Sequence, residues 1–509
     1  MKKRVLIITY YWPPSGGSGV QRWLKTSKYL PEFGWEPVIY TPLNPDVNSV
    51  DESLLKDVSP ELEVIKRKIR EPYAAYKFLS GKKKGEHLQA NLIAAESSSN
   101  NSAKTNDKSS TGGKRSFFCR LSMHIRANWF IPDPRCWWIK PSVRYLTKII
   151  RQQTTSNERT ANNNGVGFDA VISTGPPHSM HLIAKELHRR FGIPWIADFR
   201  DPWTKIFYFK HLGLSEKSLR KHKALERSVL EEADRVVVVS EQMKAEFSSG
   251  EYKGFADKVS VIPNGYDPDD FSAEKNPELK TTQQEVTRII ERHCKASSPT
   301  ETEWKKFVVA HTGLMPQSAD PDRLWKVLGD MVKADAEFKE KLLIAVMGQT
   351  DDCTRNEIAE NGLSDNFTDL GYVPHSTSVA WMKRADLLLL PLRKEKESKA
   401  IITGKFFEYL ASGNRILAFG PTDGNLAEEL RLTGSGNICE FDDEAGIKSC
   451  MQNIWKEYKE ASASGKISAQ NITAEQMARR QQFSRVTGAE NFAAMLDSIK
   501  LKAQAIITE

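Results

Sequence analysis

Residues 402–413 have the sequence ITGKFFEYLASG and follow an apolar run at residues 387–392. The apolar run predicts a buried strand, and the Thr-Gly-Lys triplet at 403–405 then opens a predicted helix. The N–H groups in the first turn of a helix attract phosphate. Lys405 and Glu408 are three positions apart, so both lie on one face of this helix. The stretch therefore predicts a phosphate-binding site at the end of a strand.

Length and charge indicate a two-domain protein with an anionic partner. The chain has 509 residues, of which 39% are hydrophobic, and a formal net charge of +8. This length exceeds what one hydrophobic core usually supports. The positive charge fits an anionic substrate or an anionic membrane surface, although a solvated basic surface has the same composition, and it does not require nucleic acid as a partner.

The cysteines and the apolar runs favour a cytoplasmic protein. The six cysteines form no C-x-x-C pair and have no histidine at zinc spacing, so we expect reduced thiols and no metal site. The run behind the basic N-terminus stops at Tyr11, too early for a signal peptide, and no run of about 18 apolar residues predicts a transmembrane helix. Any membrane contact, at the inner face of the cytoplasmic membrane, is then peripheral. The cysteines are Cys119, Cys136, Cys294, Cys353, Cys439 and Cys450.

Strand and helix patterns alternate in two series, which predicts two α/β domains with doubly wound parallel sheets. The first series has predicted strands at 5–9, 38–40, 168–173, 195–198 and 235–240, and the second at 307–310, 342–347, 387–392, 415–419 and 437–441. We place the first domain at 1–270, a polar linker region at 271–303, the second domain at 304–472, and final helices at 473–509, which we expect to pack back onto the first domain.

An insertion at about 78–130 interrupts the first domain and has two parts. Residues 97–113 are rich in Ser, Asn, Lys and Thr, so we expect them to be disordered. Residues 114–129 predict a basic, aromatic, amphipathic helix of the kind that contacts anionic bilayers. For Trp137 and Trp138, packing against the first domain is the preferred alternative.

A glycine-rich loop with Gly16, Gly17 and Gly19 follows the first predicted strand. It differs from the dinucleotide-binding fingerprint because Arg22 occupies the position of the third glycine, and the strand at 38–41 ends without an acidic residue. These differences argue against NAD as a ligand. We expect a donor-rich loop at the C-terminal end of a strand, where α/β sheets bind ligands.

Several motifs together resemble those of the family 4 glycosyltransferases, across most of the chain apart from the insertion and the linker. The resemblance implies the GT-B fold, with two Rossmann-like domains facing a cleft. It also implies transfer of a sugar from a nucleotide sugar, with retention of anomeric configuration, in bacterial surface-polysaccharide synthesis. A catalytically silent nucleotide-sugar-binding or assembly protein and a GT-B-type sugar-nucleotide epimerase are the alternatives. The motifs are residues 402–421, 11–22, 173–179, 194–203 and 261–267.

The resemblance implies a donor site and a lipid-linked or polysaccharide acceptor. A departing nucleoside diphosphate carries negative charge, which Lys405 and the helix N-terminus can stabilise without a metal. We expect no cofactor, and a UDP- or GDP-linked sugar as the donor. Glu408 would accept hydrogen bonds from the donor ribose; alternatively, it is a surface glutamate paired with Lys405. The expected donor-binding residues are Gly16, Gly17, Gly19, Gly313, Thr403, Gly404, Lys405 and Glu408.

The candidate catalytic residues are His178, Lys405 and Glu408, and three further residues are candidates on the acceptor side. His178 follows a Pro-Pro turn at a strand end, where a neutral imidazole could bind the transferred sugar or the acceptor hydroxyl, although a lone histidine is often structural. Asp198, Arg200 and Asp201 could form a polar network near the acceptor. Equally, an arginine between two carboxylates is a self-contained ion-pair cluster.

Two positions depart from the family pattern. Ala400 stands where the family has its first glutamate, and Glu395 and Glu397 are only nearby. No Arg or Lys follows the strand at 307–310, and Arg323 is a distant substitute. Donor binding would then rely more on Lys405. Residues 373–375, Val-Pro-His, are placed by position near the nucleotide base.

Overall fold

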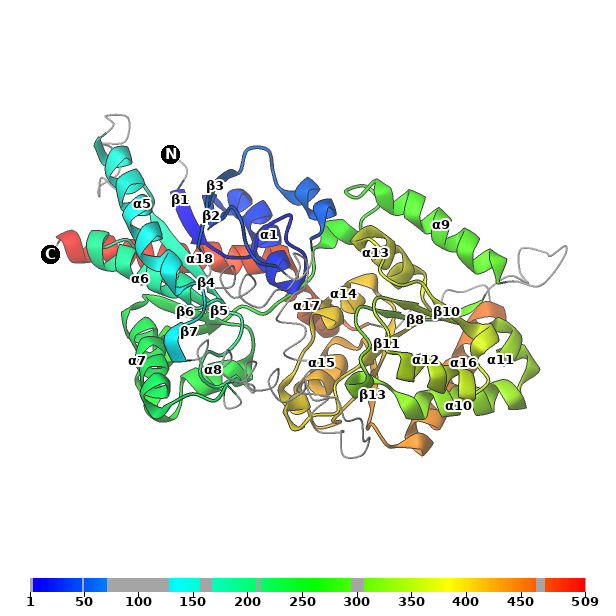
Figure 1. The fold of residues 1–509 in the computed structure, drawn as a ribbon. Coiled ribbons are helices and arrows are strands. Elements are labelled where there is room, and N and C mark those ends of the chain that lie inside the picture. The colour runs from blue at the N-terminus through cyan, green and yellow to red at the C-terminus, as the bar shows by residue number, and fades with distance from the viewer. Residues whose placement is uncertain are drawn as a thin grey trace, which may run out of the picture. The chain divides into compact units, whose positions relative to one another are not determined.

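The computed structural model describes residues 3–47, 50–70, 128–155, 167–206, 209, 212–293, 306–463 and 472–508. The chain divides into two compact units (Figure 1). Unit 1 comprises Met1–Pro263 together with Gly488–Glu509, and unit 2 comprises Asn264–Thr487. The expected disordered segment 97–113 and nearly all of the expected helix at 114–129 lie outside the described residues.

Unit 1 contains a seven-stranded sheet in the order β3-β2-β1-β4-β5-β6-β7, and every neighbouring pair is parallel. The central strands are buried on both faces, which explains their continuous apolar sequences. The strands are β1 (Lys3–Ile8), β2 (Trp35–Pro42), β3 (Glu63–Arg67), β4 (Ala170–Gly175), β5 (Trp195–Phe199), β6 (Arg235–Val238) and β7 (Val259–Val261).

Helices cover this sheet, and α5 and α6 lie side by side against it (Figure 1). Helix α18 also belongs to unit 1 from Gly488 onward, and its Phe492 packs on Trp23 with 4.9 Å between ring centroids. The helices are α1 (Ser18–Tyr29), α5 (Cys136–Thr155), α6 (Ser179–Phe191), α7 (Glu216–Glu232), α8 (Glu241–Phe247) and α18 (Arg485–Thr508). Short 3-10 helices occur at η1 (Leu30–Phe33), η2 (Glu52–Asp57) and η5 (Gly250–Lys258).

Unit 2 contains a six-stranded parallel sheet in the order β10-β9-β8-β11-β12-β13. Successive residues of β8 enter different hydrophobic clusters: Val308 and Ala310 pack in one, Phe307 and Val309 in the other. Both faces of the sheet are therefore buried under helices, as the alternating strand and helix patterns predict. The strands are β8 (Phe307–Thr312), β9 (Leu342–Met347), β10 (Phe367–Asp369), β11 (Leu387–Pro391), β12 (Arg415–Phe419) and β13 (Gly436–Cys439).

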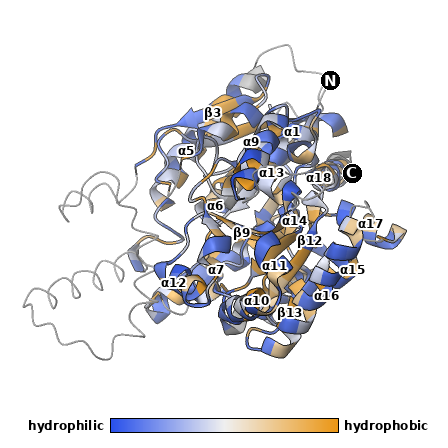
Figure 2. Ribbon diagram, turned by 90° about the vertical axis from the view of Figure 1, so that its right-hand side faces the viewer, coloured by the Kyte–Doolittle hydropathy of each residue, from blue (hydrophilic) through white to orange (hydrophobic). Residues whose placement is uncertain are grey.

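The helices of unit 2 present apolar residues to the sheet and polar residues outward, a pattern visible in the hydropathy colouring (Figure 2). They are α9 (Glu278–Arg292), α10 (Asp322–Ala334), α11 (Ala336–Lys341), α12 (Asp352–Glu360), α13 (His375–Arg384), α14 (Gly404–Ser412), α15 (Asn425–Thr433), α16 (Glu444–Ala463) and α17 (Ala474–Gln481). Short 3-10 helices occur at η6 (Pro268–Phe271), η7 (Gln317–Ala319), η8 (Ser364–Asn366) and η9 (Lys396–Ala400).

The prediction of two doubly wound parallel sheets is confirmed. Residues 271–303, which we expected to form a linker, instead contain a helix of unit 2. Within 271–303, α9 buries Leu279, Val286 and Ile290 and packs against α13 of unit 2. Prolines at both ends suggested a linker, whereas the apolar residues between them have helical spacing.

Of the final helices expected at 473–509 to pack onto the first domain, α18 does so from Gly488 onward, but α17 does not. Helix α17 packs on α15 within unit 2, where the buried Arg480 donates to the carbonyl of Thr433 at 2.8 Å. Only residues from Gly488 onward belong to unit 1.

The two tryptophans at the start of α5 behave differently. Trp138 is buried and stacks on Tyr40 with 5.3 Å between ring centroids, as the packing alternative predicts. Trp137 is 55% exposed, because consecutive residues of a helix point about 100° apart and this one is turned away from the core. None of the helices in the described part of the chain is long and apolar enough to cross a membrane.

Among the described residues, Cys136, Cys353, Cys439 and Cys450 are free thiols. The same residues contain no cluster of three or more His, Cys, Asp or Glu side chains that could hold a metal ion.

Candidate functional site

The candidate donor site lies in unit 2, at the C-terminal ends of β8 and β9. Gly313 and Gly348 follow these strands with φ of +96° and +125°, which favours glycine. A Cβ on Gly348 would lie 2.3 Å from the carbonyl oxygen of Gly313, and a Cβ on Gly313 would lie 2.6 Å from Cε of Lys405. Both positions therefore need glycine, and Gly313 leaves the space that the Lys405 side chain occupies.

Lys405 lies in the first turn of α14 and reaches back to the loop after β8. Its Nζ donates to the carbonyl of Leu314 at 2.9 Å and to Nε2 of His311 at 3.1 Å. Nδ1 of His311 lies 2.9 Å from the carbonyl oxygen of Leu389. Because a carbonyl only accepts, Nδ1 carries the imidazole proton and Nε2 is the acceptor for the ammonium group.

The protonation states follow from burial. Burial, followed by the neighbouring Lys405, lowers the pKa of His311 to about 3, so the imidazole is neutral at physiological pH. Burial also lowers the pKa of Lys405 to about 8, opposed by the carboxylate of Glu408 and assisted by Arg393. A bound phosphate would stabilise the ammonium form and raise this pKa again.

The N-terminus of α14 has the features of an anion-binding site. Thr403 is the N-cap residue, yet its side chain makes no capping hydrogen bond, and its Oγ1 is buried without a partner. Gly404 is exposed, and a Cβ added there would have no atom within 4 Å. The first N–H groups of the helix, the unpaired Thr403 hydroxyl and Lys405 thus belong to one turn.

Glu408 is hydrogen bonded to a histidine rather than paired with Lys405. Its Oε1 lies 3.0 Å from Nε2 of His375, the first residue of α13. Sequence alone placed His375 near the nucleotide base by its position after a strand, but it did not connect the two side chains. The carboxylate and the imidazole are both partly exposed, so both can meet a ligand.

Arg393 is a cation that the sequence reasoning missed. It follows β11, is exposed, and is close enough to Lys405 to lower its pKa. Arg323, the expected substitute, instead lies 3.7 Å from its neighbour Asp322 at the start of α10. A signal was present in the sequence, because Arg393 directly follows a predicted strand, where parallel sheets bind ligands.

Of the two glutamates near the position of the family glutamate, only Glu395 has a side chain in the described part of the structure. The carboxylate of Glu395 lies 3.9 Å from the guanidinium of Arg393, and the side chain of Glu397 lies outside the described part. The carbonyl of Ala400 accepts a hydrogen bond from Asn425 at 3.1 Å.

The glycine-rich loop of unit 1 is tied to the loop after β4 by Arg200. This guanidinium donates to the carbonyl of Gly19 at 2.8 Å and to that of Pro176. A Cβ on Gly19 would lie 2.9 Å from the same guanidinium, so glycine allows the close approach. Gly16 is partly exposed, and Gly17 is the N-cap of α1 with φ of +93°.

His178 lies at the N-cap of α6 and is held by aromatic contacts. Its ring is parallel to that of Trp203 at 4.5 Å, and the indole N–H of Trp203 donates to His222 at 3.1 Å. Burial, assisted by His181, lowers the pKa of His178 well below its ordinary value, so the imidazole is neutral. Nδ1 is buried without a partner.

In the described part of the chain no hydrogen bond joins Arg200 to Asp198 or Asp201, although both carboxylates are close enough to oppose the lowering of the Arg200 pKa by burial. Asp198 is fully buried and pairs with Arg22 at 2.8 Å, while Thr174 donates to it at the same distance. Burial opposes its ionisation, but the Arg22 guanidinium outweighs burial and the pKa of Asp198 is lowered. Asp201 is exposed, with no hydrogen bond in the described part. Asp198 is therefore an internal anchor of unit 1.

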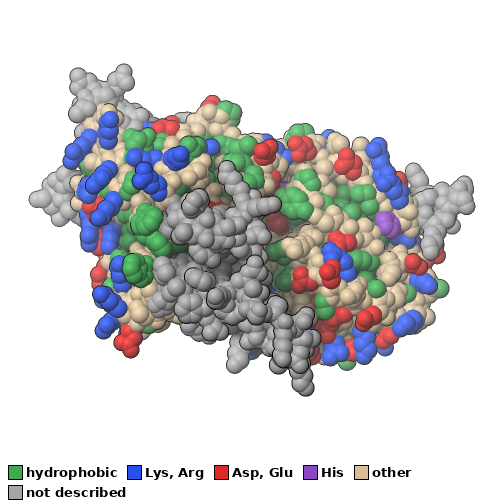
Figure 3. Space-filling view, in the orientation of Figure 1, with side chains coloured by type: hydrophobic (Ala, Val, Ile, Leu, Met, Phe, Trp, Pro, Cys, Tyr) green, Lys and Arg blue, Asp and Glu red, His purple; other side chains and the backbone are tan. Residues whose placement is uncertain are grey.

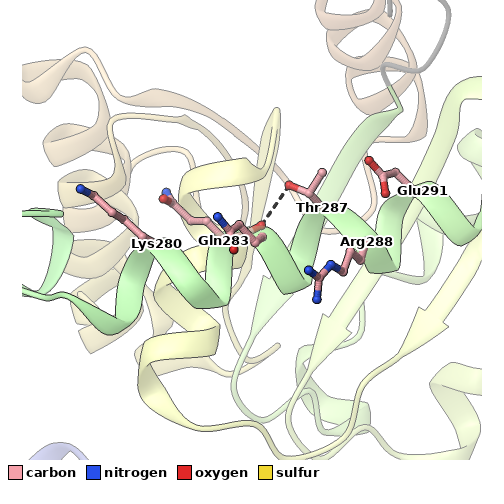
Figure 4. Close-up of a pocket in the computed structure, with 6 residues that line it drawn as sticks. Lys280, Gln283, Thr287, Arg288 and Glu291 are labelled. Atoms are coloured by element: carbon pink, nitrogen blue, oxygen red, sulfur yellow. Dashed lines mark hydrogen bonds between the residues drawn. The ribbon is translucent and has the colours of Figure 1, made fainter.

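A separate hollow of roughly 610 Å³ lies along the polar face of α9 (Figure 4). Its described lining comes from this one helix, and the hydrogen bond within it joins Thr287 to the backbone of Gln283 at 2.9 Å. No polar groups converge there from several elements, so we assign it no ligand. The lining residues are Lys280, Gln283, Gln284, Thr287, Arg288 and Glu291.

The two helix-covered parallel sheets are the Rossmann-like pair that characterises GT-B glycosyltransferases. Residues 111–270 match the model of Glycosyltransferase Family 4. No curated protein matches the chain.

Solved structures share the fold at low sequence identity. A glycosyltransferase from Rickettsia africae is 13% identical, with a TM-score of 0.53 and 98% of both chains covered. The trehalose-6-phosphate phosphatase N-terminal domain of Candida albicans is 10% identical, with a TM-score of 0.56, and 98% of this chain and 97% of that chain are covered. An alpha,alpha-trehalose-phosphate synthase (UDP-forming) from Burkholderia vietnamiensis is 14% identical, with a TM-score of 0.53 and coverage of 98% and 100%.

Proposed function

We propose that the protein is a glycosyltransferase that takes a sugar from a UDP- or GDP-linked donor. The observation that carries this proposal is the arrangement around Lys405, which stands in the first turn of α14, a helix without a side-chain cap, and whose ammonium is held by a neutral imidazole and the carbonyl of Leu314. This arrangement supplies positive charge and N–H donors in one place, which a diphosphate requires. The family match at 111–270 supports the same reading.

The chemical role of the site follows from the charge that develops during transfer. The bond between the anomeric carbon and the diphosphate oxygen breaks, a bond to the acceptor oxygen forms, and the acceptor proton is released. Lys405 and the first N–H groups of α14 stabilise the departing diphosphate. Arg393 adds a second cation close to Lys405. We propose that these groups suffice without a metal ion and that the anomeric configuration is retained.

His311 acts on this site through Lys405. If this imidazole were protonated, it would repel the ammonium group and lose its acceptor nitrogen. Its low pKa keeps it neutral and keeps the lysine aimed at the loop after β8. Glu408 would hold the donor ribose, oriented by His375.

For the acceptor, we propose a lipid-linked or polysaccharide precursor at the inner face of the cytoplasmic membrane. His178 would bind the transferred sugar or the acceptor hydroxyl as a neutral imidazole. The basic and aromatic sequence of residues 114–129 would provide peripheral membrane contact.

The direct test is binding of nucleoside diphosphates and nucleotide sugars, followed by transfer assays with the donor that binds. A ligand that binds only the folded protein raises its melting temperature with ligand concentration. Binding without transfer or donor hydrolysis would instead identify a catalytically silent binding protein.

A further inference from the structure

The exposed side of α5 carries a line of basic side chains. Lys140, Arg144 and Lys148 are all exposed, and with 3.6 residues per turn they lie on the same side of the helix as Trp137. The opposite side is buried in the core of unit 1 and includes Trp138 and Leu146. The basic line extends over roughly 16 Å along the helix from Trp137.

These three cations are not neutralised within the described part of the chain. Lys140, Arg144 and Lys148 have no acidic partner there, in contrast to Arg189 on the neighbouring α6, which pairs with Glu232 at 2.5 Å. The sequence of α5 contains no Asp or Glu. Figure 3 shows Lys and Arg side chains gathered over α5, with hydrophobic groups among them. The exposed side of α5 is therefore a continuous positive surface.

Large aromatic side chains stand at one end of this line. Trp129 is 77% exposed and Trp137 is 55% exposed. Phe130 lies against Trp137 with 5.3 Å between ring centroids. Two strongly exposed tryptophans in this part of the chain cost solvation free energy unless a partner covers them.

The start of α7 continues the same surface. The side chain of Asn128 donates to the carbonyl of Gly213 at 3.2 Å and accepts from the N–H of Ser215 at 2.8 Å, which fixes the segment before Trp129 beside this helix. Leu212 and Leu219 are 38% and 36% exposed there. The charged residues at the start of α7 are Lys217, Arg220 and Lys221, with Glu216 as the acidic exception.

We propose that this surface, formed by Trp129, Trp137, Leu212, Leu219 and the basic line of α5, docks on an anionic lipid bilayer. Tryptophan favours the headgroup region, where its ring is apolar and its N–H remains solvated. Basic side chains next to it are attracted to anionic headgroups. A soluble polyanion would bind the basic side chains but would not need the exposed leucines. This inference rests on the proposed membrane location and assigns the contact to a defined surface of unit 1. The surface does not include the donor site, so a failure of vesicle binding and a failure of donor binding are distinguished by separate measurements.

The test is cosedimentation of the full-length protein with vesicles of phosphatidylcholine alone or mixed with phosphatidylglycerol. We expect binding only to the anionic vesicles, and weakening by salt. Replacing Lys140, Arg144 and Lys148 together by Gln should weaken binding on the order of a hundredfold, about tenfold or less for each charge. Trp137→Ala should weaken binding in anionic vesicles without changing the melting temperature.

A matched control removes the same charge from unit 2. Lys280→Gln, Arg288→Gln and Arg292→Gln on the exposed face of α9 should leave vesicle binding within about twofold, because the attraction is local. Equal binding by the α5 variant and the wild type would overturn the proposal, as would equal losses in the α5 and α9 variants. Binding to short duplex DNA that is as tight as vesicle binding and unaffected by Trp137→Ala would also overturn it, since it would assign the surface to a soluble polyanion.

Discussion

At the scale of single residues, the side chains of the candidate site depend on neighbouring groups that fix their orientation and that are themselves held in one protonation state. Lys405 is held by the carbonyl of Leu314 and by a histidine that burial keeps neutral. Glu408 is held by His375. These partners come from different strands and helices, so their contacts depend on how the sheet is assembled.

The pKa of Lys405, about 8, predicts a pH dependence of donor binding. The ammonium form binds the diphosphate, so affinity should fall as pH rises through about 8. Isothermal titration calorimetry with the preferred nucleoside diphosphate between about pH 7 and about pH 9 measures this fall. In Lys405→Met the affinity should be lower and nearly independent of pH in this range. A fall of the same size in Lys405→Met would contradict the assignment.

Gly313→Ala should weaken donor binding beyond the effect of backbone strain. The positive φ alone costs about 1–3 kcal/mol of folding free energy, and the added Cβ would also displace the Lys405 side chain. Gly362→Ala is the matched control, because Gly362 has φ of +75° with no atom within 4 Å of an added Cβ. Both variants should unfold at lower denaturant concentration, but only Gly313→Ala should lose affinity. Equal affinities would contradict the proposed role of Gly313.

Asp198→Ala should destabilise unit 1 by about 3–5 kcal/mol, because it leaves Arg22 buried without its partner. Chemical denaturation followed by circular dichroism measures this loss, and Asp201→Ala should stay within about 0.5 kcal/mol of the wild type. Since the pKa of Asp198 is lowered on folding, its contribution is present above the ordinary carboxyl pKa and is lost as pH falls through the folded value. If Asp198→Ala changed the unfolding free energy only slightly but abolished activity, Asp198 would act in acceptor binding and not as an internal anchor.

At the scale of helices and strands, runs and spacings of apolar residues in the sequence predict where the central strands lie. The central strands of both sheets are continuous apolar runs, and the predicted positions agree closely with β5, β9 and β12. Strand β3 was missed because its sequence EVIKR is half polar, as suits a sheet edge. The partners of Lys405 and Glu408 could not be predicted, since each contact joins residues more than 30 positions apart.

Helix α9 should behave as a part of unit 2 rather than as a linker. Ile290→Ala removes a buried side chain and should cost about 2–5 kcal/mol of unfolding free energy. Thr287→Ala on the exposed face should change stability by less than about 0.5 kcal/mol. Urea denaturation of both variants decides between the assignments, because a flexible linker would make the two changes equivalent.

At the scale of the whole molecule, the chain leaves unit 1 at Pro263 and returns to it at Gly488. The returning segment contributes to the core of unit 1 through Phe492 and to its surface through the pair of Lys500 and Asp169 at 2.7 Å. The fold of unit 1 therefore needs residues from both ends of the sequence, as we expected for the last helix of the chain.

Truncation after Thr487 should lower the melting temperature of unit 1 and leave that of unit 2 nearly unchanged. The lost contacts expose Trp23, which is fully buried in the intact chain. Differential scanning calorimetry can separate the transitions, with Trp23→Ala as a guide to which transition belongs to unit 1. An unchanged profile would contradict the division of the chain.

The central claim is that the N-terminus of α14 and Lys405 bind the diphosphate of a nucleotide-sugar donor. The most direct measurement is thermal stabilisation by a panel of nucleoside diphosphates and nucleotide sugars, for the wild type, Lys405→Ala and Glu408→Ala. We predict that at least one nucleotide raises the melting temperature of the wild type in a concentration-dependent manner, and that this shift is lost in both variants. Stabilisation that survives in Lys405→Ala, or no stabilisation of the wild type by any nucleotide, would contradict the claim.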